Sequence, residues 1–161
     1  MNTLLIIDDE KEICESMKMI LEYEGYSVDY STSALKGINL VEEKQISCLL
    51  LDIQMPEMSG FEVLKKVKEA NPSLSVIIIS AHGSVENAVK ATRLGAFDFI
   101  EKPIDRDKLL ISVRNAVEQV KLLTENIEIK KTLEVYGEIL GLWMDVKQES
   151  AALFRRERMA Q

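Results

Sequence analysis

The sequence of 161 residues is poor in cysteine, has fewer basic than acidic residues, and contains no long apolar run. Its two cysteines, Cys14 and Cys48, fall outside any CxxC or other metal-type spacing, so we expect two buried, reduced thiols. A formal net charge of −7 disfavours non-specific binding to nucleic acid, which needs a basic surface. No apolar run reaches the roughly 18 residues of a membrane span, and the N-terminus lacks the features of a signal peptide. These deficits predict a cytoplasmic protein that binds neither membranes nor nucleic acid directly.

Short apolar segments alternate with segments of helical periodicity over the first two thirds of the chain. The expected strands and helices are, in chain order, strands 3–7, 26–30, 47–51, 74–79 and 97–100, and helices 11–23, 34–43, 61–70, 84–94 and from about 105 onward. Continuously apolar central strands separated by helices are typical of a parallel sheet that is covered on both faces. The sequence therefore predicts an α/β fold, a doubly wound five-stranded parallel sheet of flavodoxin-like type with an extended C-terminal helical segment.

Polar side chains stand where the expected strands end. Asp8 and Asp9 follow the first strand, Asp52 the third, Ser80 the fourth and Lys102 the fifth. In a doubly wound sheet, ligands bind beyond the carboxyl ends of the strands, so we expect these five side chains to converge.

The types of these residues indicate phosphoryl chemistry at a metal site. Carboxylates this close together repel one another, and Mg²⁺, a hard cation with oxygen ligands, would relieve the repulsion. A carboxylate can also accept a phosphoryl group and form an aspartyl-phosphate. Asp52 is the best candidate because its strand is expected to be central, while Lys102 would stabilise charge on the transferring oxygens and Ser80 could donate a hydrogen bond.

Four segments around these residues resemble the receiver domains of bacterial two-component response regulators, and they read LLIIDDE, LLLDIQMPEMSGFEVL, VIIISAHGS and GAFDFIEKP. Their order and spacing are most similar to the nitrogen-regulator class, over about residues 1–120. The resemblance implies a signalling switch of the phosphorelay type, not an enzyme with a separate substrate. Asp52 would accept a phosphoryl group from a sensor histidine kinase in an Mg²⁺-dependent reaction.

The resemblance also implies a set of metal ligands. Asp9 and Asp52 would bind Mg²⁺ through their side chains, and Gln54 through its backbone carbonyl. Asp8 would hold a metal-bound water or assist directly. These ligands are all oxygen atoms, as Mg²⁺ prefers.

By the same resemblance, Lys102 would contact the phosphoryl group, and its peptide bond to Pro103 would be cis. Ser80 would be the switch hydroxyl and Phe99 the switch aromatic residue. Phosphorylation would draw Ser80 toward the phosphoryl group and let Phe99 turn inward, which would reshape the face formed by the fourth helix, fifth strand and fifth helix. Partner binding or homodimerisation through that face would then change, in a direction that the resemblance leaves open.

A helical extension, residues 121–161, is expected to follow the receiver domain of residues 1–120. Apolar residues in a 4-3-4-3-4 spacing predict a coiled-coil seam, formed by Leu109, Val113, Ala116, Val120, Leu123 and Ile127. Packing on the sheet accounts for Leu109–Ala116, so only the part beyond Val120 needs a partner, and a homodimer is the simplest one. The register fails at Lys130, although apolar residues such as Trp143 and Phe154 continue along the extension.

Three other functions compete with a stand-alone switch. The chain could be part of a transcription factor whose DNA-binding region lies outside it, and it contains no GxxxxGK[ST] loop of an ATPase domain. A phosphatase of the haloacid-dehalogenase kind would carry a DxD motif and an inserted cap, whereas Asp8 and Asp9 are adjacent here. A purely structural coiled coil would have no need of Asp52, Ser80 and Lys102.

Overall fold

The computed structural model describes residues 2–159, and it describes the side chains of residues 2–141. Its elements are β1 (Thr3–Ile7), α1 (Lys11–Tyr23), β2 (Ser27–Ser31), α2 (Ala34–Glu43), β3 (Cys48–Asp52), α3 (Gly60–Ala70), β4 (Ser75–Ser80), α4 (Val85–Arg93), β5 (Asp98–Glu101) and α5 (Arg106–Met159). The side chains of Trp143 and Phe154, which the sequence places on the apolar side of the extension, lie outside the described residues.

The five strands form one parallel sheet in the order β2-β1-β3-β4-β5. This order confirms the predicted doubly wound fold, with β3 in the centre. Four of the strands begin and end one residue or so later than the apolar runs predict. The reason is that the polar residue after each central run is still paired in the sheet, because Asp52 pairs with Ile79 and Ser80 with Glu101.

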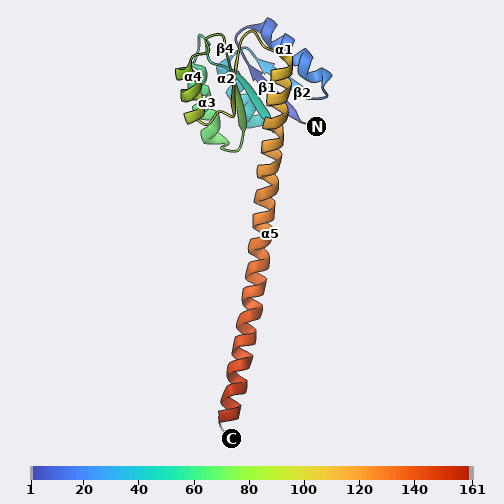
Figure 1. The fold of residues 1–161 in the computed structure, drawn as a ribbon, viewed down its shortest axis with the longest axis vertical. Helices are drawn as coiled ribbons and strands as arrows, with labels where there is room; N and C mark the ends of the chain where they lie inside the picture. Colours follow the sequence, from blue (N-terminus) through green and yellow to red (C-terminus); the bar gives the residue numbers. More distant parts are fainter. Residues whose placement is uncertain (1, 160–161) are drawn as a thin grey trace. The chain divides into compact units, whose positions relative to one another are not determined.

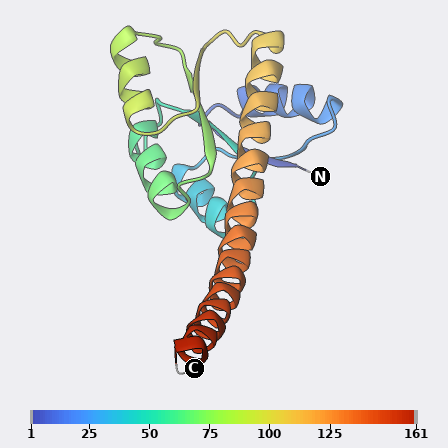
Figure 2. The same cartoon turned by 60° about the horizontal axis from the view of Figure 1, so that its bottom comes forward.

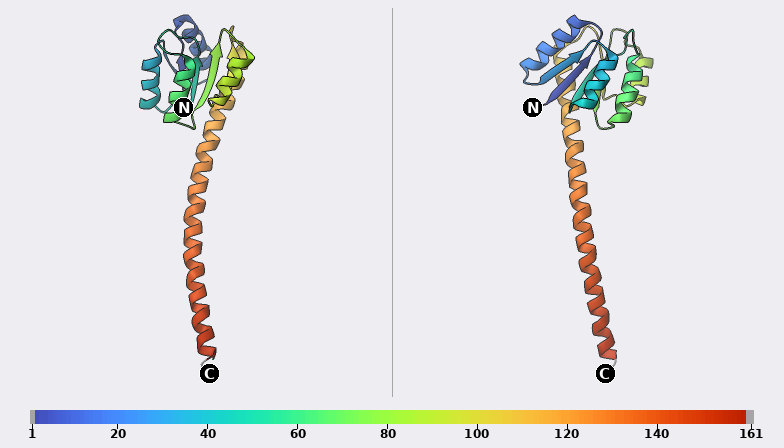
Figure 3. Two further views of the ribbon diagram at one scale, coloured as in Figure 1. Left: turned by 90° about the vertical axis from the view of Figure 1, so that its left-hand side faces the viewer. Right: turned by 180° about the vertical axis from the view of Figure 1, so that it is seen from behind.

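Helices cover both faces of the sheet (Figure 1 and Figure 2). Alternate strand residues point to opposite faces. Leu49 and Leu51 pack with α2, α3 and α4, whereas Leu50 packs with α1 and the first turns of α5. Figure 3 shows α1 and α2 on opposite sides of the strands. Fully buried residues on both faces explain why the central strands are apolar without alternation.

Local signals set the helix boundaries near the carboxyl edge of the sheet. The side chains of Ser33, Ser59 and Ser84 accept hydrogen bonds from backbone N–H groups in the first turns of α2, α3 and α4. A Cβ at Gly60 would collide with the backbone of Asp52 and Ile53. Glycine therefore lets α3 begin directly against the end of β3, which holds the connecting loop beside Asp52.

The chain divides into two compact units, Met1–Lys121 and Leu122–Gln161. The first contains the sheet, its helices and the first turns of α5, and the second contains the remainder of that helix as far as Met159. Within the described part of the chain, no helix combines the length and the apolar character that crossing a membrane requires.

Candidate functional site

The ends of three strands bring four acidic side chains and one lysine together. Asp8, Asp9 and Glu10 follow β1, Asp52 is the last residue of β3, and Lys102 follows β5. Asp8 is 1% exposed and Asp52 is 3% exposed, although both carry a charge in water at neutral pH. Burial of two neighbouring carboxylates is expensive unless cations accompany them.

Lys102 is the cation that the chain itself supplies. Its Nζ lies 3.0 Å from Asp8 Oδ2, 3.6 Å from Asp52 Oδ1 and 3.7 Å from Glu10 Oε1. The backbone N–H of Lys102 donates to the carbonyl of Ser80 at 2.8 Å, which fixes this residue beside the end of β4. The peptide bond between Lys102 and Pro103 is cis. The ammonium group of Lys102 therefore forms ion pairs with three carboxylates.

The pKa values reflect this excess of negative charge. Burial, followed by the charge of Asp8, raises the pKa of Asp52 to about 7, although Lys102 and a backbone hydrogen bond from Gln54 oppose the rise. Burial also raises the pKa of Asp8. Burial lowers the pKa of Lys102, but the hydrogen bond and charges of the carboxylates outweigh it and leave the pKa raised. Lys102 stays charged, and the carboxylates remain short of positive charge.

The donor set fits a hard divalent cation. Asp8 Oδ2 is buried and, apart from its ion pair with Lys102, receives no hydrogen bond from the described residues. Carboxylate oxygens of Asp8, Asp9 and Glu10 lie within 4.8 Å of one another. Oxygen donors of this kind suit Mg²⁺, and soft metals would prefer thiolate or imidazole.

A cavity of about 620 Å³ opens over these acids, and its lining includes Asp9, Glu10, Asp52, Gln54 and Lys102. The structure thus brings together the predicted metal ligands Asp9, Asp52 and Gln54, with Asp8 buried behind them. Asp52 and Gln54 line this cavity without belonging to the tight carboxylate cluster. Sequence reasoning missed Glu10, although its place directly after two aspartates was a visible signal.

Ser80 lies at the end of β4, but its hydroxyl group is engaged elsewhere. Its Oγ donates to the carbonyl of His82 at 3.1 Å and accepts from the His82 N–H at 3.1 Å. The Asn87 side chain of α4 donates to the same carbonyl at 3.2 Å. Ser80 is fully buried and does not line the cavity over the acids. A move toward Asp52 would require this hydroxyl to release His82.

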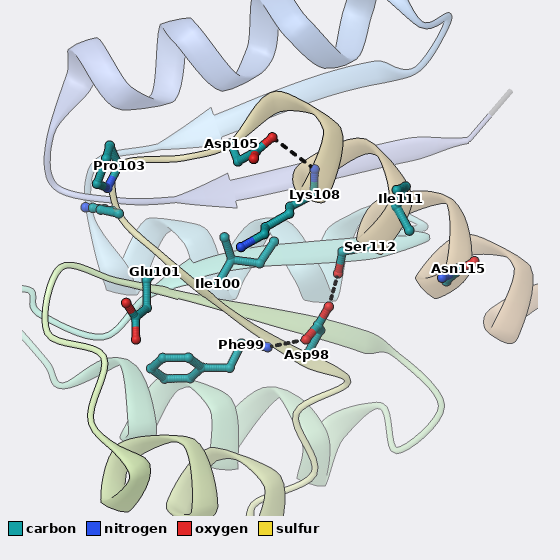
Figure 4. A pocket seen from close by; sticks show the side chains of 11 residues that line it. Asp98, Phe99, Ile100, Glu101, Pro103, Asp105, Lys108, Ile111, Ser112 and Asn115 are labelled. Carbon is teal, nitrogen blue, oxygen red and sulfur yellow. Dashed lines mark hydrogen bonds between the residues drawn. The ribbon is translucent and has the colours of Figure 1, made fainter.

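Phe99 lies at a second cavity, of about 710 Å³, between β5 and the first turns of α5 (Figure 4). Phe99 is partly buried against the core shared with α2, α3 and α4. Figure 4 also shows Ser112 of α5 and Asp98 of β5 pointing toward one another, with the Ser112 hydroxyl donating to Asp98 Oδ2 at 2.6 Å. Lys102 and Pro103 line this cavity too, so the loop after β5 joins the acidic site to the β5–α5 face.

Comparison with known proteins points to one family. Residues 4–114 match the family described as the response regulator receiver domain. A putative response regulator, NtrX-like, from Rickettsia bellii (strain RML369-C) is 39% identical over 140 residues, which are 86% of this chain and 29% of the relative. The chain spans about three tenths of the NtrX-like relatives that it matches.

Two solved structures are similar to the chain in sequence and in fold. NtrX from Brucella abortus is 34% identical and superposes with a TM-score of 0.75, covering 80% of this chain and 30% of that one. The solution structure of the beryllofluoride-activated NtrC4 receiver domain dimer is 36% identical, with a TM-score of 0.72, and covers 74% of this chain and 99% of that one.

Proposed function

This chain belongs to the family of response regulator receiver domains, and from that premise we propose that Asp52 accepts a phosphoryl group from a sensor histidine kinase in an Mg²⁺-dependent reaction. The observation that supports Asp52 most strongly is its position. It ends the central strand, lines the open cavity and has Lys102 Nζ 3.6 Å away. Asp8 is the weaker candidate, because it lies behind the cavity, paired with Lys102 at 3.0 Å and hydrogen-bonded by the Glu10 N–H at 2.9 Å.

In the proposed reaction, a carboxylate oxygen of Asp52 attacks the phosphorus of a phosphohistidine. A phosphorus–oxygen bond forms while the phosphorus–nitrogen bond breaks, and the imidazole leaves with the electron pair and takes up a proton. When bound by Asp8, Asp9, Asp52 and the Gln54 carbonyl, Mg²⁺ would neutralise charge on the phosphoryl oxygens. Lys102 supplies a second positive charge at the same place. The domain catalyses only this transfer and the slow hydrolysis of its own aspartyl-phosphate, in the cytoplasm.

The proposed switch starts from the hydroxyl of Ser80. A phosphoryl group on Asp52 adds strong acceptor oxygens and nearly two negative charges. Ser80 then exchanges its bonds with the His82 backbone for a bond to a phosphoryl oxygen, and Phe99 follows into the space that is released. The face formed by α4, β5 and α5 changes shape and alters partner binding or homodimerisation. A similar receiver domain, that of NtrC4, is a dimer in its beryllofluoride-activated form.

Incubation with acetyl phosphate tests the proposal without knowledge of the kinase. We expect the intact mass to increase by one phosphoryl group in the presence of Mg²⁺ and to remain unchanged in EDTA. Asp52→Asn should gain no phosphoryl mass. Asp29→Asn, which removes an exposed carboxylate of β2 that pairs with Lys44, is the matched control and should gain as much as wild type. Equal labelling of wild type and Asp52→Asn would rule out Asp52 as the acceptor.

A further inference from the structure

The extension of α5 carries an apolar face that the described residues leave exposed. The exposed fraction is 50% for Leu122, 55% for Ile129, 63% for Leu133, 61% for Tyr136 and 57% for Leu140. Ile127, Val135 and Ile139 are equally exposed but lie off this row. Single exposed apolar residues are common on protein surfaces, whereas a row of large ones at regular spacing, broken here only by Asn126, marks an interaction site. Gly137 and Gly141 lower the intrinsic stability of this helix, because glycine has a low helix propensity. A helix of this kind gains most of its stability from packing of its apolar face.

The exposed row follows a heptad repeat in a different register from the seam that the sequence first indicates. That first seam uses Leu109, Val113 and Ala116, which are fully buried in the receiver core, and it ends at Lys130. A second seam begins with the second compact unit and keeps a 4-3-4-3-4 spacing, through Leu122, Asn126, Ile129, Leu133, Tyr136 and Leu140. It is offset by one residue, which turns the apolar face by about 100° around the helix axis.

We infer that residues 122–140 pair with the same residues of a second copy of this chain in a parallel, two-stranded coiled coil. This inference rests on the homodimer of the proposed function and specifies which residues form it and in which direction the helices run. In heptad notation the a positions are Asn126, Leu133 and Leu140, and the d positions are Leu122, Ile129 and Tyr136.

Asn126 favours the parallel arrangement. In a parallel pair, a positions face a positions, so the two Asn126 amides meet and satisfy each other's hydrogen bonds. In an antiparallel pair, each would face an apolar d residue and lose its partner in the seam. A single asparagine at an a position also limits the number of strands to two, against the preference of Ile129 at d and Leu133 at a for larger assemblies.

The charges beside the seam agree with the same arrangement. Glu125 occupies a g position, and Lys130, five residues later, occupies the following e position. In a parallel coiled coil, a g residue lies next to the e residue of the following heptad on the partner helix. Each dimer would therefore contain two Glu125–Lys130 pairs of opposite charge, whereas an antiparallel pair would separate these residues.

Light scattering of the full chain, with and without acetyl phosphate, tests the seam. We expect dimers that Leu133→Asp converts to monomers. Ile127→Asp is the matched control, because Ile127 is also 50% exposed but belongs to the first seam and lies outside the second. Dimers that survive Leu133→Asp, or that Ile127→Asp disrupts as strongly, would overturn the inference, as would a wild-type monomer under both conditions.

Two further sets of variants test the direction of the helices. Glu125→Lys and Lys130→Glu should each weaken the dimer, and the double variant should restore it. Asn126→Cys should form an intermolecular disulfide under mild oxidation far more efficiently than Ile127→Cys, since Cα atoms must lie within about 7 Å. No restoration and equal cross-linking would exclude the parallel register. Phosphoryl mass is measured on the same samples, so a dimer without label would count against Asp52 alone, and a labelled monomer against the coiled coil alone.

Discussion

Two stretches of α5 have the same spacing of apolar residues and a very different environment. Leu109 is completely buried in the receiver core, whereas Ile127, five steps along the same 4-3-4 pattern, is 50% exposed. The pattern defines which residues share a face of the helix, but the sheet decides which of them is covered. Truncation of an apolar side chain should therefore affect the buried stretch of α5 and its exposed stretch differently.

The largest expected difference comes from truncating one leucine in each stretch. Leu109→Ala should lower the free energy of unfolding of the receiver unit by about 2–5 kcal/mol, because it leaves a cavity in a packed core. Leu133→Ala should change it by less than about 0.5 kcal/mol. Labelling of the buried Cys48 thiol in urea reports this unfolding, since Cys48 is 0% exposed in the folded state. Similar losses for the two variants would erase the distinction between core and extension.

Addition of Mg²⁺ should stabilise the receiver unit and leave the extension unaffected. A ligand that binds only the folded state adds about 2.7 kcal/mol when its free concentration is about 100 times Kd. The same Cys48 labelling should show this gain for wild type. Asp9→Asn should show little or none, although its stability without metal should be close to that of wild type, because Asp9 is exposed. A full gain in Asp9→Asn would remove Asp9 from the metal site.

The pH dependence of stability that Asp52 causes has a defined sign. Its pKa rises from 3.8 in the unfolded chain to about 7 in the folded one, so the folded state resists ionisation of this group. The resulting loss of stability is small below about pH 3, grows as the pH rises through the unfolded value of 3.8 and is complete above about pH 7. Without metal, Asp52→Asn should therefore be more stable than wild type at pH 8, by at most about 4 kcal/mol.

At pH 3 the urea midpoints of wild type and Asp52→Asn should nearly coincide, because the carboxyl group is then largely protonated in both states. Mg²⁺ should also reduce the difference at pH 8, since a cation relieves the repulsion that Asp52→Asn removes. A difference that is constant from pH 3 to pH 8 would show that ionisation of Asp52 is not its cause.

The smallest expected effect comes from a substitution in the extension itself. Gly137→Ala should stabilise the helix by about 0.5–1 kcal/mol, as no atom outside the helix lies within 4 Å of the added Cβ. The melting temperature followed by helical circular dichroism should rise. Cys48 labelling, which reports the receiver unit, should not change, and a shift in labelling would show that the two units unfold together.

The sequence predicted the fold well because strand runs, helix periodicity and strand-end polar residues all agree with one topology. It placed the ends of β3 and β4 one residue early, since apolar character ends before sheet pairing does. It located the acids of the site through a general property of parallel sheets, but it missed Glu10, whose involvement follows from the local path of the chain after β1.

Other features depend on packing that no single segment of sequence encodes. The bonds between Ser80 and the His82 backbone depend on the loop after β4, and they hold the hydroxyl away from the cavity over the acids. The seam that we infer for the extension also differs from the one that the sequence first indicates. Leu109, Val113 and Ala116 are buried against the sheet, so the first half of the predicted register is not open to a partner. The second register follows from the spacing of the apolar residues beyond residue 121.

The central claim, that Asp52 is the phosphoryl acceptor, is tested most directly by locating the acyl phosphate in the chain. Borohydride reduces an acyl phosphate of aspartate to homoserine, and peptide mass spectrometry then identifies the position after labelling with acetyl phosphate and Mg²⁺. We predict homoserine at position 52 alone. Homoserine at position 8 or 9, with none at 52, would contradict the account.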